Sequence, residues 1–392
     1  MTETATPQTT LPTPLAALLL QVAQVGAPEL VAYRGVLTPN RFDEAEKETA
    51  KLVFAAVVHD LGWLRRVAVR GEDRFRWLSG MVTNTVTDLG TNAGAWNLVL
   101  NAQGRIQGDL YVWREGDELQ LTISADQYDR LLAHLERFII MDDVELVPLG
   151  EETALGLAGP MAADLLARVG LPALAVPMTS ARAEWNGHEM RIARGYGVLA
   201  PHYELWVQAA EIPSLWKALT EAGATPVGAA TLEAFRIAEG IPAYGIDIAE
   251  RDLPQEVVPQ SATIPGAMKS MRANSEQVAP PLVALSFNKG CYLGQEIVER
   301  IRSRGSVHRH LRQLEISGPV PAAGAELTLD GGAIAGQITS VAELQLANGS
   351  RIFALAMMRG EAEQRNQSFT YTSGTATGTA NILAAPPRLE AS

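Results

Sequence analysis

The sequence predicts an α+β protein with antiparallel sheets, followed by an all-β C-terminal module. Short strands joined by turns alternate with amphipathic helices twice, first over residues 67–146 and again over 155–239. Repeated units of this kind favour antiparallel layers over a doubly wound parallel sheet. After about residue 309 only short strands and turns remain, which is typical of an all-β module.

The first set contains a strand and a short helix, then three strands, then a helix and a final strand. Turns are expected at 101–104 and 116–117, where Asn, Asp and Gly divide the strands. Apolar residues between 131 and 138 recur at helical spacing. In order, the elements are expected at 67–69, 72–78, 96–100, 109–113, 119–123, from 126, and at 144–146.

The second set repeats this arrangement, and the C-terminal module follows it. A helix opens at Gly159-Pro160 and Gly170 is expected to end it, because glycine readily takes the left-handed conformation after a helix. Two strands and two helices follow at 190–193, 204–207, 213–222 and 229–239. The C-terminal strands are expected at 312–316, 326–329, 334–341 and 352–357.

Composition excludes several classes of protein. Of 392 residues, 47% are hydrophobic and 19% charged, which rules out wholesale disorder and allows two or three domains. The formal net charge of −12 argues against a nucleic-acid partner. The apolar stretch 15–25 is about half of the roughly 20 residues that a membrane span needs, and no Lys or Arg precedes it. We therefore expect a cytoplasmic protein.

Residues 289–300 carry the strongest chemical signal. Cys291 is the single cysteine, so the chain alone can build neither a disulfide nor a thiolate-rich metal site, and no metal site is expected. A helix expected from about Gly294 and the ammonium of Lys289 would both favour the thiolate form of Cys291. The alternative is a small buried hydrophobic residue, which is what most lone cysteines are.

The stretch Lys289-Gly290-Cys291-Tyr292-x-Gly294-Gln295-Glu296 resembles the signature of the YgfZ family. These proteins are folate-binding relatives of the aminomethyltransferase (T-protein) of the glycine cleavage system. Further motifs of the family occur in order, so that the resemblance covers roughly residues 50–345. They lie at 69–84, 101–110, 236–256 and 304–340.

The resemblance implies a ring of three subdomains around a central folate pocket, closed by the C-terminal β-module. On this basis residues 1–45 are expected to form a variable N-terminal extension. Residues 46–150 together with 228–310 would form a discontinuous folate-binding core. Residues 151–227 would form a second α+β subdomain, and 311–385 a barrel-like domain.

The resemblance also implies roles for individual residues. Glu204 matches the usual pterin anchor, and Asp109 is expected to be a catalytic carboxylate that contacts folate; its alternative is a strand-start carboxylate that bonds a turn. Arg236 could pair with the glutamate tail of folate, or be a surface arginine. Lys289 is expected to act with Cys291, and the remaining cofactor-binding candidates are Asn84, Asn101, Tyr292 and Gln295.

The function implied is binding of tetrahydrofolate or a derivative in support of the assembly or repair of iron–sulfur enzymes, including radical enzymes that thiolate tRNA. Partners would then be a reduced folate and iron–sulfur client enzymes, without direct contact to nucleic acid. A folate-dependent aminomethyltransferase is the alternative, and a scaffold without ligand is a third possibility.

The five arginines within 300–312 suit a solvated surface or a docking site. The Pro-rich segment 257–284 suits a lid or an insertion.

Overall fold

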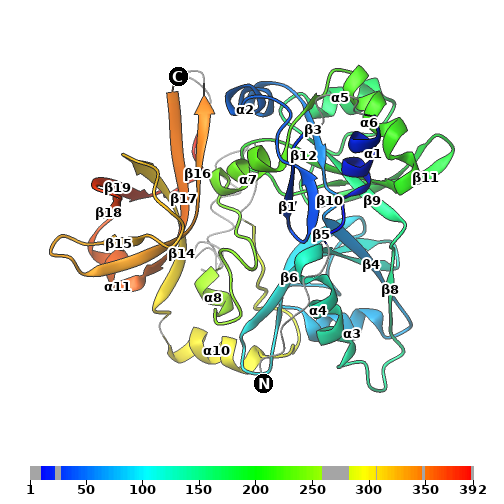
Figure 1. Cartoon of the computed structure of the whole chain (residues 1–392). Coiled ribbons are helices and arrows are strands. Elements are labelled where there is room, and N and C mark those ends of the chain that lie inside the picture. The colour runs from blue at the N-terminus through cyan, green and yellow to red at the C-terminus, as the bar shows by residue number, and fades with distance from the viewer. Residues whose placement is uncertain (1–9, 23–27, 258–281, 306, 347–348, 390–392) are drawn as a thin grey trace, which may run out of the picture.

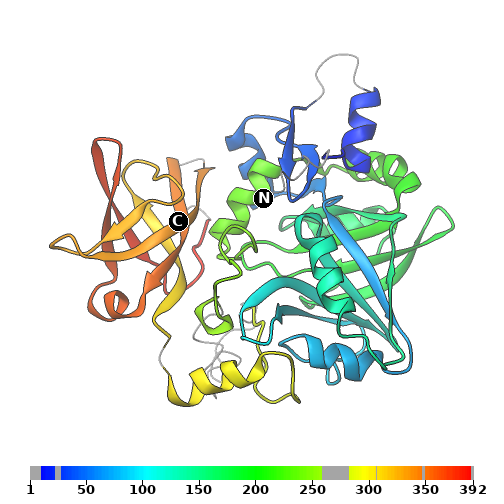
Figure 2. The same cartoon turned by 60° about the horizontal axis from the view of Figure 1, so that its bottom comes forward.

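The computed structural model describes residues 10–22, 28–257, 282–305, 307–346 and 349–389. Within these ranges, eleven strands form one sheet, two form a hairpin and six form a closed barrel. Figures 1 and 2 show the barrel on one side of the molecule and the large sheet with its helices on the other. The expected α+β class and the all-β C-terminal module are confirmed.

Residues 10–22 and 28–45 contribute contacts to the large sheet. The hydroxyls of Thr13 and Thr38 both donate hydrogen bonds to the buried carboxylate of Asp60. Leu15 is buried in the same apolar cluster as residues of helices α5 (Ala162–Arg168) and α6 (Ile212–Glu221). The expected N-terminal extension, residues 1–45, therefore has described parts that share buried contacts with the core. The elements are α1 (Pro14–Val22), β1 (Leu30–Tyr33), β2 (Val36–Pro39), α2 (Ala45–Phe54) and β3 (Val57–Asp60).

The first half of the sheet follows the sequence prediction closely. The turns at 101–104 and 116–117 join antiparallel strands as expected. Helices α3 and α4 cover the sheet through a core that includes Trp77, Leu78 and Leu131. The elements are β4 (Leu64–Arg70), α3 (Arg74–Met81), β5 (Ala93–Leu100), β6 (Ile106–Glu115), β7 (Glu118–Ser124), α4 (Ala125–Glu136) and β8 (Glu145–Pro148).

The second half repeats this plan. Gly170 follows α5 with a φ of 77°, as expected for the residue that ends a helix. The elements are β9 (Glu152–Ala158), α5 (Ala162–Arg168), β10 (Thr179–Trp185), β11 (His188–Arg194), β12 (His202–Gln208), η1 (Ala209–Glu211), α6 (Ile212–Glu221), β13 (Thr225–Pro226) and α7 (Ala229–Ala238).

The two halves form one curled sheet in the order β13-β3-β9-β12-β11-β10-β5-β6-β7-β4-β8. Except for the short β13–β3 pair, neighbouring strands are antiparallel. Strands β4 and β9 are far apart in this order, yet Arg66 on β4 forms an ion pair with Glu152 on β9. The sheet therefore wraps around an interior that is lined by one of its faces.

The C-terminal barrel packs on α2 and α7 through β16 and β17, with Leu344 and Phe353 buried against Phe235. The last two barrel strands were not expected from the sequence. The elements are α8 (Pro254–Val257), α10 (Gln295–Arg304), β14 (Arg309–Ser317), β15 (Glu326–Thr328), β16 (Ile334–Leu346), β17 (Gly349–Arg359), α11 (Gly360–Arg365), β18 (Ser368–Ser373) and β19 (Ala376–Ile382).

Most of the segment 257–284, interpreted above as a lid or insertion, lies outside the described residues. Its last residues return to the core, because the carbonyls of Val283 and Ala284 accept hydrogen bonds from Asn84 and Thr83. No helix in the described ranges is long and apolar enough to cross a membrane.

Candidate functional site

A cavity of about 180 Å³ lies between the β1–β2 hairpin, both halves of the sheet and α7. Strands β6 and β12 supply much of its wall, since residues at alternate positions of a strand face the same side. None of its lining residues in the described chain comes from 311–385, so the barrel does not close it directly. The polar and aromatic residues that line it include Tyr33, Arg34, His59, Trp63, Tyr111, Trp113, Tyr196, His202, Glu204, Arg236 and Glu239.

Several buried nitrogens at this cavity have no hydrogen-bond partner among the described residues. They are Nε of Arg34, both ring nitrogens of His59 and the indole nitrogen of Trp63. A buried polar group without a partner costs about 1–3 kcal/mol, and native proteins rarely tolerate several together. A polar ligand would supply the partners that these nitrogens lack among the described residues.

The hairpin that presents Arg34 is strained in a way that fits this role. Tyr33 pairs with Val36, so Arg34 and Gly35 form a two-residue turn, and their φ angles are 50° and 87°. Glycine adopts such angles freely, but a long side chain at positive φ is uncommon and often marks a functional position. The hydroxyl of Tyr33 donates to Glu233 over 3.0 Å, which fixes the hairpin on α7.

His59 and His202 form a buried pair on the wall, with ring centroids 5.2 Å apart. Burial lowers the pKa of His202 to about 4, and burial together with His202 lowers the pKa of His59 well below its usual range. Both rings are therefore neutral near pH 7, and each offers one donor and one acceptor. Room for His59 depends on Gly156 on the adjacent strand, because a Cβ there would lie 1.9 Å from the ring.

Glu204 is buried on β12 and lines the cavity. Its Oε2 accepts one hydrogen bond, from the indole of Trp206 at 2.9 Å. Burial raises the pKa of this carboxyl, and the bond from Trp206 and the nearby Arg191 and Arg66 oppose that shift. Among the described residues, no hydrogen bond to the other oxygen, Oε1, is formed.

Arg236 also lines the cavity, but its guanidinium is engaged within the protein. It forms ion pairs with Glu233 and Asp247 and donates to the carbonyl of Ile241. The guanidinium that was expected to bind the glutamate tail of folate is thus paired with two acids of the same chain. Of the two arginines that line the cavity, Arg34 is the one whose buried Nε has no hydrogen-bond partner among the described residues.

Glu239 was not selected from the sequence, yet it lies in the wall. Its Oε1 accepts hydrogen bonds from the backbone N–H groups of Val198 and Leu199, at 2.8 and 2.9 Å. Burial raises the pKa of Glu239 to about 7. The residue holds the 198–200 loop against α7. The YgfZ-type motif places an acid directly after Arg-Ile, but here the acid is shifted by one position, so it was not carried over from the family.

Asp109 lies on the same face of β6 as Tyr111 and Trp113, at the end of that row. Its two oxygens accept hydrogen bonds from the indole of Trp96 and the amide of Gln127, both at 2.9 Å. Burial raises the pKa of Asp109, and these two donors oppose the shift. The carboxylate is held by side chains rather than by a turn.

The cysteine motif forms a second group of residues, and none of them lines the cavity. The ammonium of Lys289 donates to the carbonyls of Ser79, Val82 and Asn84 at 2.6–2.8 Å, so it ties the motif to the end of α3. Burial lowers the pKa of Lys289 to about 7. Cys291 is exposed and lies just before Gly294, the residue that precedes α10.

The other predicted residues of this group stabilise the loop. Gln295 accepts a hydrogen bond from the backbone of Tyr292, which is buried, and Asn101 accepts from the backbone of residues 103 and 105. Asn84 donates to the carbonyls of Trp96 and Val283. Because the indole of the same Trp96 bonds Asp109, this tryptophan connects the cysteine group to the cavity row of β6.

The arginines between 300 and 312 mostly contact acids of the same chain. Arg300 and Arg302 pair with Glu296 and Glu299 along α10, and Arg309 pairs with Asp252 and Glu256. Arg312 contacts Glu363. These contacts fit the solvated-surface interpretation, since the charges are largely compensated locally.

A curled two-part sheet around a polar cavity, followed by a barrel, defines the class of T-protein-like folds. The glycine cleavage system aminomethyltransferase T from Bartonella henselae superposes with a TM-score of 0.78 at 19% identity, covering 95% of this chain and 96% of that one. The expected T-protein-like fold is thereby confirmed. The model of the GCVT N-terminal domain matches residues 19–260, and the chain belongs to this family.

Curated relatives agree with this assignment. A chloroplastic protein of Arabidopsis thaliana, named for a proposed transferase activity, is 26% identical over 333 residues, which are 84% of this chain and 71% of the relative. An aminomethyltransferase of Rubrobacter xylanophilus is 27% identical over 319 residues, 79% of this chain and 78% of the relative.

Proposed function

We propose that this chain binds a reduced folate in the 180 Å³ cavity and, as a protein of the YgfZ type, supports the assembly or repair of iron–sulfur enzymes, including those that thiolate tRNA. One observation carries the folate proposal. A buried carboxylate, Glu204, shares a cavity with the unpartnered nitrogens of Arg34, His59 and Trp63.

This set of groups fits a pterin. The aminopyrimidine edge of a pterin presents adjacent N–H donors, which the carboxylate of Glu204 can accept, and charge-assisted bonds of this kind are the strong ones. Tyr111 and Trp113 supply aromatic walls for the ring. The cavity is smaller than the roughly 300–1,000 Å³ of sites that hold a whole drug-sized ligand, so it accommodates the ring system while the tail extends outward.

Calorimetric titration with tetrahydrofolate and with 5-formyltetrahydrofolate tests this proposal. Glu204→Gln should weaken binding by tenfold or more, because hydrogen bonds to a charged group contribute about 1.5–3 kcal/mol and 1.4 kcal/mol is a factor of ten. Glu184→Gln is the matched control, since Glu184 is exposed and does not line the cavity. Absence of heat with both folates, or unchanged affinity in Glu204→Gln, would sink the proposal.

The role in iron–sulfur enzymes is attributed to the exposed thiol of Cys291. Cys291→Ser should fail to restore the activity of iron–sulfur enzymes in a strain that lacks this protein. Because the side chain is exposed, the substitution should leave the free energy of unfolding within about 0.5 kcal/mol of the original, which separates loss of chemistry from loss of fold. Full restoration by Cys291→Ser would refute the role of the thiol.

A folate-dependent aminomethyltransferase is the second candidate. It is favoured by the placement of Asp109 at the end of the cavity row of β6 and by relatives that are named aminomethyltransferases. The reaction to assay is formation of methylenetetrahydrofolate from an aminomethyl donor. Turnover that is abolished by Asp109→Asn would favour this enzyme over the YgfZ-type function, whereas folate binding without turnover would favour the latter.

A further inference from the structure

A second pocket, of about 420 Å³, lies on the same inner face of the sheet. Four strands contribute residues to both spaces. On each of these strands, one residue lines the folate cavity and the residue two positions away lines this pocket. These pairs are Leu64 and Arg66, Trp113 and Glu115, Thr122 and Gln120, and Glu204 and Trp206. Because two residues along a strand span about 6.6 Å, the two spaces are neighbours in one interior.

A layer of stacked side chains separates the two spaces. The guanidinium of Arg66 lies 5.2 Å from the ring centre of Trp206, and that of Arg191 lies 5.3 Å from the ring centre of Trp113. The indole of Trp206 also donates to Glu204. The second pocket is thus a separate site, and its occupancy does not depend on the folate proposal.

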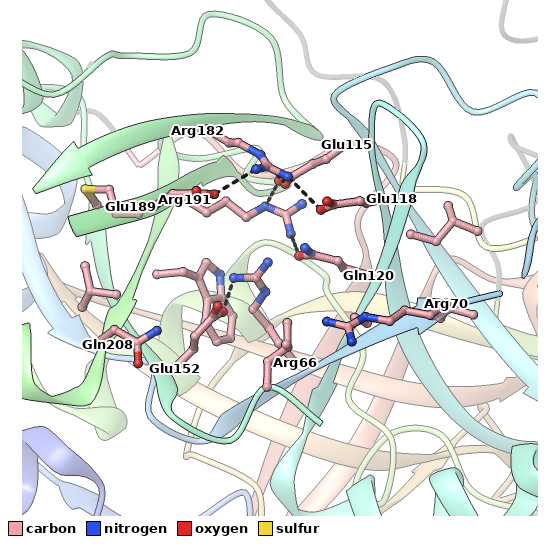
Figure 3. A pocket seen from close by; sticks show the side chains of 17 residues that line it. Arg66, Arg70, Glu115, Glu118, Gln120, Glu152, Arg182, Glu189, Arg191 and Gln208 are labelled. Atoms are coloured by element: carbon pink, nitrogen blue, oxygen red, sulfur yellow. Dashed lines mark hydrogen bonds and ion pairs between the residues drawn. The ribbon is translucent and has the colours of Figure 1, made fainter. Parts of the chain in front are cut away.

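Most charges in the second pocket are compensated internally, as Figure 3 shows. Arg191 pairs with Glu115 and donates to Gln120. Arg182 pairs with Glu118 and Glu189 at the rim, so these two acids are already occupied by a cation.

Two arginines on β4 are different. Arg66 contacts Glu152 through one terminal nitrogen, and 4% of its side chain is exposed. Its Nε is buried and has no hydrogen-bond partner among the described residues. Arg70 is exposed, and the described part of the chain provides no hydrogen bond or ion pair for its side chain. Residues four apart on a strand face the same side, and Figure 3 shows both side chains at the pocket.

We propose that this pocket binds a small molecule through an oxyanion, a carboxylate or a phosphate, held by Arg66 and Arg70. The planar guanidinium offers paired N–H donors that match both groups, and a buried donor without a partner costs free energy until a ligand supplies an acceptor. Beside the two arginines, the indole of Trp206 offers an apolar surface to the rest of the ligand. The volume is that of an ordinary small-molecule site.

The test is calorimetric titration of the full chain with inorganic phosphate and, separately, with succinate. At least one of them should bind saturably, and Arg70→Gln should weaken that binding about tenfold or more, because it removes a charge-assisted contact. Arg41→Gln is the matched control and should bind as the unaltered chain does. Arg41, like Arg70, is exposed, and neither side chain forms an ion pair within the described residues, so neither change should affect folding.

The two titrations also distinguish the sources of the oxyanion. Binding of phosphate alone assigns a phosphorylated ligand, and binding of succinate alone assigns a carboxylic acid. The proposal is overturned if neither anion gives saturable heat, or if Arg70→Gln binds as tightly as Arg41→Gln.

Discussion

Replacing Asp247 should loosen the C-terminal barrel from α7, the helix that lines the 180 Å³ cavity. This buried carboxylate accepts four hydrogen bonds. On one oxygen the donors are Arg236 and the backbone of Ala243, at 2.7 and 3.0 Å. On the other they are the hydroxyls of Thr339 and Ser340 in the barrel, at 2.6 and 2.7 Å.

The geometry predicts different costs for two substitutions. Asp247→Asn keeps one oxygen for Arg236 and Ala243, while its amide can donate to the hydroxyls, which accept as well as donate. This substitution then removes mainly the negative charge. We expect it to lower the free energy of unfolding by about 2 kcal/mol, which is within the range for hydrogen bonds to charged groups. Asp247→Ala removes this partner of Arg236 in a buried site. We expect it to lower the free energy of unfolding by about 3–5 kcal/mol.

The assay is urea unfolding near pH 7, with the free energy of unfolding obtained from the midpoint and slope. Glu250→Gln serves as the control, because Glu250 is exposed and changes at such positions stay within about 0.5 kcal/mol. If Asp247→Ala cost less than about 1 kcal/mol, the carboxylate would not be what holds the barrel to α7. Equal costs for the two substitutions would contradict the assigned orientation of the amide.

Three further outcomes are expected. Gly156→Ala should destabilise the chain by about 1–3 kcal/mol through its clash with His59, and a second change, His59→Ala, should recover part of the loss in thermal unfolding. Burial raises the pKa of Glu239 from 4.5 to about 7, so the folded chain keeps a proton that the unfolded chain releases. The free energy of unfolding should therefore fall as the pH rises from about 4.5 to about 7, and Glu239→Gln should flatten this slope; an unchanged slope would contradict the assignment. Lys289→Met should lower the free energy of unfolding in urea by about 1–3 kcal/mol, because three carbonyls lose their hydrogen-bond donor. An unchanged free energy of unfolding would show that water replaces the ammonium at these carbonyls.

Local patterns in the sequence were sufficient for much of the fold. The turn at 101–104 and the glycine at 170 were predicted because their conformations follow from residue type. Strands β18 and β19 were missed, although Phe369 and Tyr371 alternate with polar residues, because Thr- and Ser-rich stretches also suit loops.

The site was harder to predict because its contacts are long-range. Tyr33 and Arg34 lie in a segment that shows little apolar periodicity, and nothing local indicates that they reach the cavity. The partner of Arg236, Asp247, is eleven residues further along the chain, so helical spacing could not reveal that its guanidinium was occupied. Glu204 was selected through a family motif, and the structure places it in the wall of the cavity, while its role in binding stays a prediction.

The attachment of the N-terminal hairpin has a consequence for synthesis of the protein. Tyr33 binds Glu233, 200 residues later, and Arg34 binds the carbonyl of Tyr244, 210 residues later. At roughly 5–20 residues per second, a ribosome needs about 10–40 s to add that length of chain. During this time the hairpin emerges without its partners, so the nascent chain exposes it to chaperones until α7 has left the exit tunnel.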